Sequence, residues 1–574
     1  MAVFTPENER IRSSFSMPTW LNAKGIVIAV AMLIVFWLAV IPLGFLLWQS
    51  FHSTGTLQTP SVLTLENYAT VFESAESLVL MGNSLQFALF TAAFALVLGT
   101  FFAWVNERTN TPFKSLFFAM SIIPLIIPGI LFTVSWIMLA SPKIGILNKI
   151  LGNWFDIYSM AGMVWVDGLH YAPVAFLLVT AAFRSMDPSL EESAMMSGAS
   201  IAQTAFKVTL KLAWPAVLAA FIILFIRAIE SFEVPALLGL PIGLQVYTSA
   251  IYDAVHSYPS NIGLASTYAV VLLLITSIGI YYQSRLSSQG SKYSTVTGKG
   301  FRPRVADIGR WRYVTGGVFI LYVTLVVGLP FLVLLWASLQ RYYSAPSWAA
   351  VQRLSFGAYQ KVLEYPGFYT AVWNSVKLAL GGATVVMLLT SVICWITVRT
   401  KIPGRWLLDV LASLPLVFPG IVLGLALMVF YLNVDIGIYG TLWIMLMSYV
   451  IKFMPYGMRY NATSMVQIHK ELEESAEMCG ASWLMTFRSV VLPLLKPGFV
   501  AGWIYIIVVS VRELSSSILL YSPGNEVISI MIWEFWQNGQ YTELSAFGVM
   551  MITVLFCFVM LVQLVSKRLG VKGI

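Results

Sequence analysis

The chain has 574 residues, of which 58% are hydrophobic and only 10% are charged, and its mean hydropathy is +0.81. Soluble proteins carry about 25% charged residues, so this composition excludes an ordinary soluble protein and indicates a membrane protein. The net charge of +8 comes from Lys and Arg in short segments between apolar runs, which indicates membrane topology and not nucleic-acid binding. Three distant cysteines and four scattered histidines give no disulfide framework and predict no metal site.

The amino-terminal segment, residues 1–24, is polar and basic, and an apolar run follows at 25–48. This run is longer than the core of a signal peptide, and no small-residue cleavage site follows it. We therefore predict that it is retained as a first membrane span.

Further apolar runs, each long enough to cross a bilayer core of about 30 Å as a helix, follow along the chain. The first half has runs at 25–48, 83–105, 115–140, 158–183, 215–240 and 262–283. The second half has runs at 313–337, 374–397, 406–431, 441–464, 497–520 and 544–566. The sequence predicts an all-α polytopic membrane protein with about twelve transmembrane helices.

The segments between the runs differ in their content of basic residues. Those that would share a side with the amino terminus are rich in Lys and Arg, and the stretch from Arg285 to Arg312 alone holds seven. The segments on the opposite side are poorer, and 521–541 has none. By the positive-inside rule, both termini are predicted to be cytoplasmic.

The two halves of the chain resemble each other. Asn83–Thr109 parallels Asn374–Thr400 at an offset of 291 residues. Six spans in each half return the chain to the same side, so the repeats are predicted to be parallel. We predict a first membrane domain at 25–286, a basic cytoplasmic linker at 287–312 and a second membrane domain at 313–574.

Prolines recur at equivalent places in both halves. The third run contains IIPLIIPGI and the ninth contains SLPLVFPGI, which aligns the Pro-Gly pairs at 128–129 and 419–420. Pro173 and Pro455 are equivalent in the fourth and tenth runs. Since proline removes a helix hydrogen bond, these two runs are predicted to be kinked.

A charged segment between the fourth and fifth runs of each half is duplicated. Nine of the eleven residues of Leu190–Ser200 are identical to those of Leu472–Ser482. Ser189 with Glu192 fits a capping box, Gly198 fits a helix end, and Ser200 with Gln203 fits the start of a second helix. The pattern predicts a compact helix–turn–helix that projects into the cytoplasm. A solvated amphipathic connector is the alternative, and the duplication argues against it.

This segment resembles the EAA loop of the permease subunits of binding-protein-dependent ABC importers. Ser193 and Ser475 replace the first alanine of the motif, and Lys211 replaces a proline that the second half keeps as Pro493. The resemblance covers nearly the whole chain. It assigns ATPase coupling to Glu192, Ala194, Gly198, Glu474, Ala476 and Gly480.

The resemblance implies the type I ABC importer permease fold in a bacterial cytoplasmic membrane. It also implies partners: two copies of an ABC ATPase subunit, one on each duplicated segment, and one solute-binding protein outside. The chain contains no G-x-x-x-x-G-K-[ST] phosphate loop, so it is expected to be a transport subunit and not an enzyme. No cofactor is expected in this chain, and ATP and Mg²⁺ are expected on the partner subunits.

Fused double permeases of this length most resemble the ferric-iron importers. Ile229–Asp253 and Arg512–Phe535 look like the fifth-span regions of that group. Thiamine, sulfate, polyamine and phosphonate permeases are also related and remain open alternatives. The binding protein sets most of the specificity in such importers.

Charged residues near the fifth and eleventh runs are candidates for the translocation path, because intramembrane charges usually face an aqueous path or a bundle interior. They are Arg227, Glu230, Glu233, Arg512 and Glu513. Glu230 and Glu513 align approximately and could meet across the pseudo-twofold axis. The structural alternative is that Arg227 and Glu230, three residues apart, neutralise each other. Asp167 and His170 are interpreted as packed polar groups, and direct metal ligation is not predicted.

Two other functional classes compete with an ABC permease. An ion-coupled secondary transporter would also show repeats and buried charges, but it would not need duplicated cytoplasmic helices. A membrane enzyme or scaffold would need a catalytic cluster or a large extramembrane domain, and the sequence shows neither.

Overall fold

The computed structural model describes residues 23–55, 60–152, 155–187, 189–289, 305–400, 402 and 404–568. These residues are almost entirely helical, and the only β pairing among them consists of two isolated bridges, His52–Leu63 and Thr109–Ala306. Helices are expected here because a backbone in lipid must satisfy its hydrogen bonds within its own segment. The all-α prediction is confirmed.

The first half of the chain begins with two short helices that continue each other and form the first span. Its elements are α1 (Ala23–Ala39), α2 (Ile41–Ser50), α3 (Glu66–Glu73), α4 (Ala75–Arg108), α5 (Lys114–Ile122), η2 (Ile123–Ile126), α6 (Gly129–Ala140), α7 (Ile146–Leu151), α8 (Met160–Ser185), α9 (Ser189–Met196), α10 (Ile201–Thr204), η3 (Ala205–Thr209), α11 (Leu210–Ile229), η4 (Pro235–Gly239), η5 (Leu240–Ile242), α12 (Tyr247–His256) and α13 (Ile262–Gln289).

The second half repeats this order. Its elements are α14 (Trp311–Val323), η7 (Thr324–Gly328), α15 (Leu329–Ser338), α16 (Trp348–Val351), α17 (Gly357–Glu364), α18 (Phe368–Cys394), η8 (Trp395–Arg399), α19 (Arg405–Ser413), η9 (Leu414–Val417), α20 (Gly420–Asn433), α21 (Leu442–Gln467), α22 (Glu471–Met478), α23 (Trp483–Thr486), η10 (Phe487–Val491), α24 (Leu492–Val511), η11 (Ser517–Leu519), α25 (Ile528–Gln537) and α26 (Tyr541–Arg568).

Helices occupy all twelve predicted span positions. Within the described part of the chain, nine are long and apolar enough to cross a membrane, or eleven if two bent helix pairs are each one span. The position that falls outside this set is α21, which carries Lys452, Arg459 and several tyrosines and is therefore less apolar.

The third and ninth spans are broken, and the prediction of continuous runs at 115–140 and 406–431 is corrected here. The axis turns by 99° between η2 and α6 and by 109° between η9 and α20. Pro128 and Pro419 stand at the turns in an extended conformation, with ψ near 140°. Proline has no N–H to continue the hydrogen-bond ladder, so the helix restarts at the glycine that follows.

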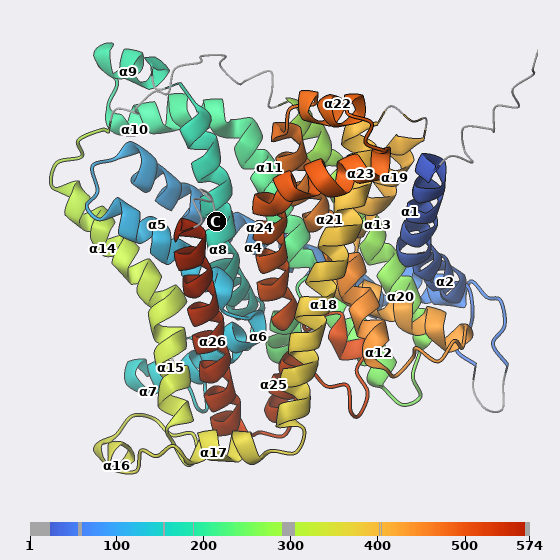
Figure 1. Cartoon of the computed structure of the whole chain (residues 1–574). Helices are drawn as coiled ribbons and strands as arrows, with labels where there is room; N and C mark the ends of the chain where they lie inside the picture. The colour runs from blue at the N-terminus through green and yellow to red at the C-terminus, as the bar shows by residue number, and fades with distance from the viewer. Residues whose placement is uncertain are drawn as a thin grey trace, which may run out of the picture.

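The first span of each half packs on the broken span of the other half. Helix α2 packs on α20, and α15 packs on α6 (Figure 1). Phe430 of α20 lies between two aromatic rings of the first span, Trp37 at 5.4 Å and Phe45 at 4.9 Å. In the reciprocal contact, the Tyr343 hydroxyl donates to the Met138 carbonyl at 2.5 Å. The halves are therefore joined by an exchange of spans.

Helices α9 and α22 lie at the same end of the molecule, as two parallel repeats require (Figure 1). Most of the predicted segment 1–24 and residues 290–304 of the predicted linker lie outside the described residues. After the linker, Ala306 pairs with the end of α4 by hydrogen bonds to Arg108 and Asn110. Asp307 accepts hydrogen bonds from the Asn110 amide and the Gly309 N–H, which lower the pKa of its carboxyl.

Candidate functional site: two coupling helices and a charged cavity

Each duplicated segment forms a short helix, a glycine turn and a second helix. Gly198 and Gly480 end α9 and α22 with φ of +89° and +83°, a left-handed conformation that glycine adopts without steric cost. The N–H of the following alanine closes each turn by donating to the carbonyl of Ala194 or Ala476, at 3.0 Å in both copies. The predicted glycine turn is confirmed, and the motif alanines supply its carbonyl acceptors.

Only one of the two predicted helix caps forms in the structure. Ser200 and Gln203 form the predicted reciprocal capping box, with bonds of 3.2 and 3.0 Å. The prediction that Ser189 caps α9 with Glu192 is wrong. Ser189 lies inside the first turn, and its N–H donates to the Asp187 carboxylate at 2.9 Å. An aspartate two residues upstream therefore accepts from the Ser189 N–H, the donor that the Glu192 side chain would serve in a capping box.

We call α9–α10 with its turn, and α22–α23 with its turn, the two knobs. The outer face of each knob exposes apolar side chains. Met196 is 87% exposed and its equivalent Met478 is 89% exposed, and leucines at 190 and 472 are exposed beside them. Exposed apolar groups at equivalent places on a polar surface indicate a contact site for another protein, and methionine adapts readily to a partner.

The adjacent glutamates of each knob behave differently. The motif residues Glu192 and Glu474 form no ion pair among the described residues, whereas Glu191 and Glu473 are anchored to Arg108 and Arg399. Sequence reasoning selected the motif glutamates for coupling and missed the two anchors. The sequence does contain a signal for these anchors, because both arginines occupy the same place in the repeated Asn83–Thr109 segment and its counterpart.

A cavity of about 790 Å³ lies between the two halves. Its wall comes from the broken spans, from α8, α11, α21 and α24, and from Val559 and Val562 of α26. All five predicted path residues contribute to its lining. The full charged set is Asp167, Arg227, Glu230, Glu233, Lys452, Arg459, Arg512 and Glu513.

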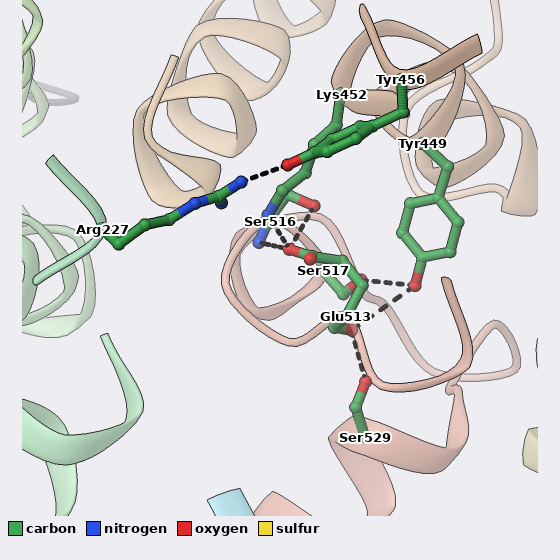
Figure 2. Close-up of polar contacts among 8 residues, drawn as sticks. All are labelled: Arg227, Tyr449, Lys452, Tyr456, Glu513, Ser516, Ser517 and Ser529. Carbon is green, nitrogen blue, oxygen red and sulfur yellow. Dashed lines mark hydrogen bonds and ion pairs between the residues drawn. The ribbon is translucent and has the colours of Figure 1, made fainter. Parts of the chain in front are cut away.

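Glu513 is held in place by several donors. The Lys452 ammonium lies 2.6 Å from its carboxylate, and the backbone N–H and hydroxyl of Ser516 donate to the same oxygen at 3.0 and 3.2 Å (Figure 2). Glu230, its approximate counterpart, has a carboxylate oxygen without a hydrogen-bond partner among the described residues. The two carboxylates line one cavity, and within the described residues no hydrogen bond or ion pair joins them. The described bonds to the Glu513 carboxylate all go to its Oε1, whereas Glu230 Oε1 has none.

Two of the three arginines of the cavity, Arg227 and Arg512, reach across to the opposite half. Arg227 donates to the Tyr456 hydroxyl, as Figure 2 shows, and Arg512 donates to the Leu125 carbonyl at the break of the third span. Within the described residues Arg227 and Glu230 form no ion pair within 4 Å, and their mutual neutralisation stays a prediction. These two arginines tie the two halves together.

Asp167 is buried and His170 is half-buried, in keeping with packed polar groups, but both also line the cavity. Asp167 is 2% exposed, and one of its carboxylate oxygens and His170 Nδ1 have no hydrogen-bond partner among the described residues. The second half has Tyr449 and Lys452 at these places, and the Tyr449 hydroxyl is bonded to the Ser517 hydroxyl at 3.0 Å. The first-half wall is therefore the more acidic one.

The helices after each break begin beside charged groups of the cavity. A Cβ on Gly129 would lie 3.6 Å from the Glu233 carboxyl carbon, and a Cβ on Gly420 would lie 2.6 Å from the Lys452 nitrogen. Glycine at the start of α20 leaves room for the Lys452–Glu513 pair. Within the described residues, no group of three or more His, Cys, Asp and Glu side chains has the geometry of a metal site.

The family model of the binding-protein-dependent transport system inner membrane component matches the chain twice, at residues 95–289 and 387–571. The chain belongs to this family. It is an inner-membrane permease with two copies of the family domain in one polypeptide, and the sequence-based resemblance to ABC importer permeases is confirmed.

Several relatives resemble the permease over most of its length or one half. The ferric transport system permease protein FbpB of Actinobacillus pleuropneumoniae is 26% identical and covers 84% of this chain and 70% of the relative. The putative ferric transport system permease protein FbpB 1 of Haemophilus influenzae is also 26% identical, over 87% of this chain and 78% of the relative. The sulfate transport system permease protein CysT of Salmonella typhimurium is 28% identical over 44% of this chain and 92% of the relative.

A solved structure also aligns with the permease. A chain from the crystal structure of a bacterial alginate ABC transporter, in complex with an alginate pentasaccharide-bound periplasmic protein, is 18% identical. The alignment covers 46% of this chain and 96% of that chain, with a TM-score of 0.37.

Proposed function

We propose that the permease is the fused transmembrane subunit of an ATP-driven importer that carries ferric iron into the cytoplasm. One observation carries this proposal: two equivalent knobs with exposed methionines lie at one end of a charged cavity between the halves. A secondary transporter has no use for two such surfaces, whereas two motor subunits need one surface each.

Each knob is proposed to dock into one ABC ATPase subunit, where ATP and Mg²⁺ bind. The exposed Met196 and Met478 would enter the partner surface, with the motif glutamates Glu192 and Glu474 beside them. The knob end is then cytoplasmic, and both termini lie on that side. A solute-binding protein would dock at the opposite end and deliver the cargo.

The cavity is proposed to be the translocation path, with Arg227, Glu230, Glu233, Arg512 and Glu513 in its wall. Carboxylates that face water lower the electrostatic barrier for a cation, because oxygen atoms replace part of its hydration shell. Glu230 and Asp167 each have a buried carboxylate oxygen without a hydrogen-bond partner among the described residues, so they are proposed to accept a cation. Glu513, already bonded to Lys452, serves to position the wall.

Iron is proposed as cargo because the ferric permeases match this chain over more than four fifths of its length. A sulfate importer is the competing proposal within the same class, since a sulfate permease also matches and Arg227, Arg459 and Arg512 line the cavity. Thiamine, phosphonate and polyamine remain alternatives from the sequence resemblance.

The test is uptake in proteoliposomes that contain the permease, its ATPase and the cognate binding protein. Radiolabelled ferric iron should accumulate only when ATP is present. If ATP drives the uptake of sulfate, thiamine or a phosphonate instead of iron, the iron proposal fails and the importer proposal stands. Uptake driven by an ion gradient without ATP would contradict both.

A further inference from the structure

We propose that the ion pairs Arg108–Glu191 and Arg399–Glu473 transmit movement of the knobs directly to the second span of each half. This inference rests on the proposed function and adds a route for coupling to it. The pairs are not part of the EAA motif match, which falls on the next glutamate along each helix.

The covalent chain from each knob leads to the fifth span. In the first half, α9 and α10 continue through the π-helical turn η3 into α11. In the second half, α22 and α23 continue through the π-helical turn η10 into α24. Because a π-helical turn interrupts the regular hydrogen-bond ladder, force along this route passes through an irregular segment in both halves.

Each arginine also joins three helical elements in a junction by non-covalent contacts, which are separate from the covalent route to the fifth span. Arg108 is the last residue of α4, its Nε lies 3.0 Å from the Glu191 carboxylate of α9, and its Nη2 donates to the Phe183 carbonyl of α8 at 2.8 Å. Arg399 is the last residue of η8. Its Nε lies 3.1 Å from the Glu473 carboxylate of α22, and its Nη2 donates to the Met465 carbonyl of α21 at 2.6 Å. The second span, the end of the fourth span and the knob thus meet at one guanidinium.

The two junctions are built from equivalent residues. Arg399 is Arg108 shifted by 291 residues, and Glu473 and Met465 are Glu191 and Phe183 shifted by 282. Carbonyl acceptors do not depend on the side chain, which is why Phe and Met serve equally at that place. Only the charged pair itself has to be the same in both halves, and it is.

Both pairs are withdrawn from solvent. The Arg108 and Glu191 side chains are 4% and 8% exposed, and the Arg399 and Glu473 side chains are 6% and 16% exposed. An exposed ion pair contributes little and lets its partners move apart, whereas a buried pair resists separation because an unpaired buried charge is strongly unfavourable. The knobs are therefore held to the second spans wherever the ATPases push them.

The second contact at each glutamate differs between the halves. The Thr209 hydroxyl, at the end of η3, donates to Glu191 at 2.8 Å. In the second half, the Trp395 indole N–H donates to Glu473 at 3.3 Å. Its ring is stacked between Trp483 at 3.8 Å and Phe487 at 4.4 Å. Only the arginine–glutamate pair is common to both junctions, so it is the element to test.

The second spans lead from these junctions to the cavity. Helix α4 packs along α8 and α11, and α18 packs along α21 and α24. These four partners carry four of the eight charged lining residues, and the other four follow within four residues of the ends of α11 and α24. A knob that moves α4 or α18 therefore moves the wall from behind. This gives each ATPase two connections to the path, one through the fifth span and one through the second.

The experiment compares three variants of the full chain, each assembled with the ATPase and the binding protein in proteoliposomes. The first is Arg108→Gln with Arg399→Gln. The second replaces all four partners by methionine, which removes both charges without leaving a buried one unpaired. The matched control is Arg184→Gln, which breaks the Arg184–Glu107 ion pair of 2.9 Å next to the first junction, where the Arg184 side chain is 54% exposed.

The readout is solute moved per ATP hydrolysed, with the number of ATPase copies per chain measured on the same preparation. We expect the four-methionine variant to bind two ATPases and to lose about tenfold in solute moved per ATP, within the usual range of coupling between sites. The arginine variant should lose at least as much, and the control should match the wild type.

Two outcomes would overturn the proposal. If the four-methionine variant moves as much solute per ATP as the wild type, the pairs only support the fold. If it loses ATPase binding, the pairs only shape the docking surface. Failure of the proposed function looks different, because the wild type itself would then hydrolyse ATP without moving iron or any solute of the panel.

Discussion

Gly480 gives the sharpest test at the scale of a residue. Its φ of +83° is unfavourable for a side chain with a Cβ by about 1–2 kcal/mol, and more so for a β-branched one. We expect Gly480→Val to reach the membrane at normal levels and to lose most of its ATP-driven uptake. A Cβ there would meet no atom within 4 Å, so backbone strain and not crowding is the cause.

The matched control at this position is Gly480→Asn, since asparagine tolerates the left-handed conformation better than other residues. It should retain most of the uptake. Equal uptake by the valine and asparagine variants would show that the turn is not a mechanical element.

Glu230 and Glu513 should respond differently to the same change. Glu513→Gln leaves Lys452 without its partner, and removing one member of a buried pair costs about 3–5 kcal/mol, less here because Lys452 also faces the cavity. We expect a lower melting temperature for the purified Glu513→Gln chain, measured by tryptophan fluorescence in detergent.

Glu230→Gln breaks no ion pair and should melt like the wild type. Iron uptake should nevertheless slow several-fold, while ATP hydrolysis stimulated by the binding protein persists. The reverse pattern, with an unstable Glu230 variant and a stable Glu513 variant, would contradict the division of roles in the cavity.

Sequence reasoning at this scale succeeded where the backbone alone decides. A glycine after a short acidic helix predicts a left-handed turn without knowledge of the rest of the fold. It was less successful for side chains whose partners are distant, because Glu191 pairs with Arg108, 83 positions away. Such partners are set by how helices pack, which periodicity does not encode.

At the scale of elements, the start of α20 is more constrained than the start of α6. A Cβ on Gly420 would lie 2.6 Å from Lys452 Nζ and 2.8 Å from Ser515 Cβ, while the nearest atom to a Cβ on Gly129 is 3.6 Å away. Gly420→Ala should therefore destabilise the chain by about 1–3 kcal/mol through overpacking.

Gly129→Ala is the control and should stay within about 0.5 kcal/mol of the wild type. The melting temperatures of the two purified variants, compared with that of the wild type, test this difference in stability. Equal stability of both would mean that the Lys452–Glu513 pair can move away from α20 without loss.

The broken spans show what an element-level reading of the sequence lacked. The length and apolarity of 115–140 and 406–431 predicted crossing helices, and helices do form there. The Pro-Gly pairs at 128–129 and 419–420 were aligned between the halves but were not interpreted as breaks. A proline that starts a helix and one that kinks it look alike in sequence, and the packing of the other half on α6 and α20 decides between them.

At the scale of the whole molecule, the two knobs predict the stoichiometry of the assembly. Each chain should bind two ATPase copies, and native mass spectrometry of the complex in mild detergent would measure this directly. A single bound ATPase, with no loss during handling, would contradict the equivalence of the knobs. Lys211, in place of the proline found at 493, makes the first knob the one expected to dissociate first.

The exchange of first spans between the halves has a consequence for biosynthesis. Helices α1 and α2 leave the ribosome long before α20, the surface on which α2 finally packs, so the first span has to remain in the bilayer without its partner. Only a segment that is stable when surrounded by lipid can remain unpaired in the bilayer until its partner helix is made. Among the nine long apolar helices of the described residues, Gly25–Ser50 and Trp311–Ser338, the first spans of the two halves, are the two most apolar. For Gly25–Ser50 this composition suits the order of synthesis, because the segment can insert early as an independent helix and pack later on α20. Trp311–Ser338 does not have to wait, because its partner α6 has already been made when it emerges.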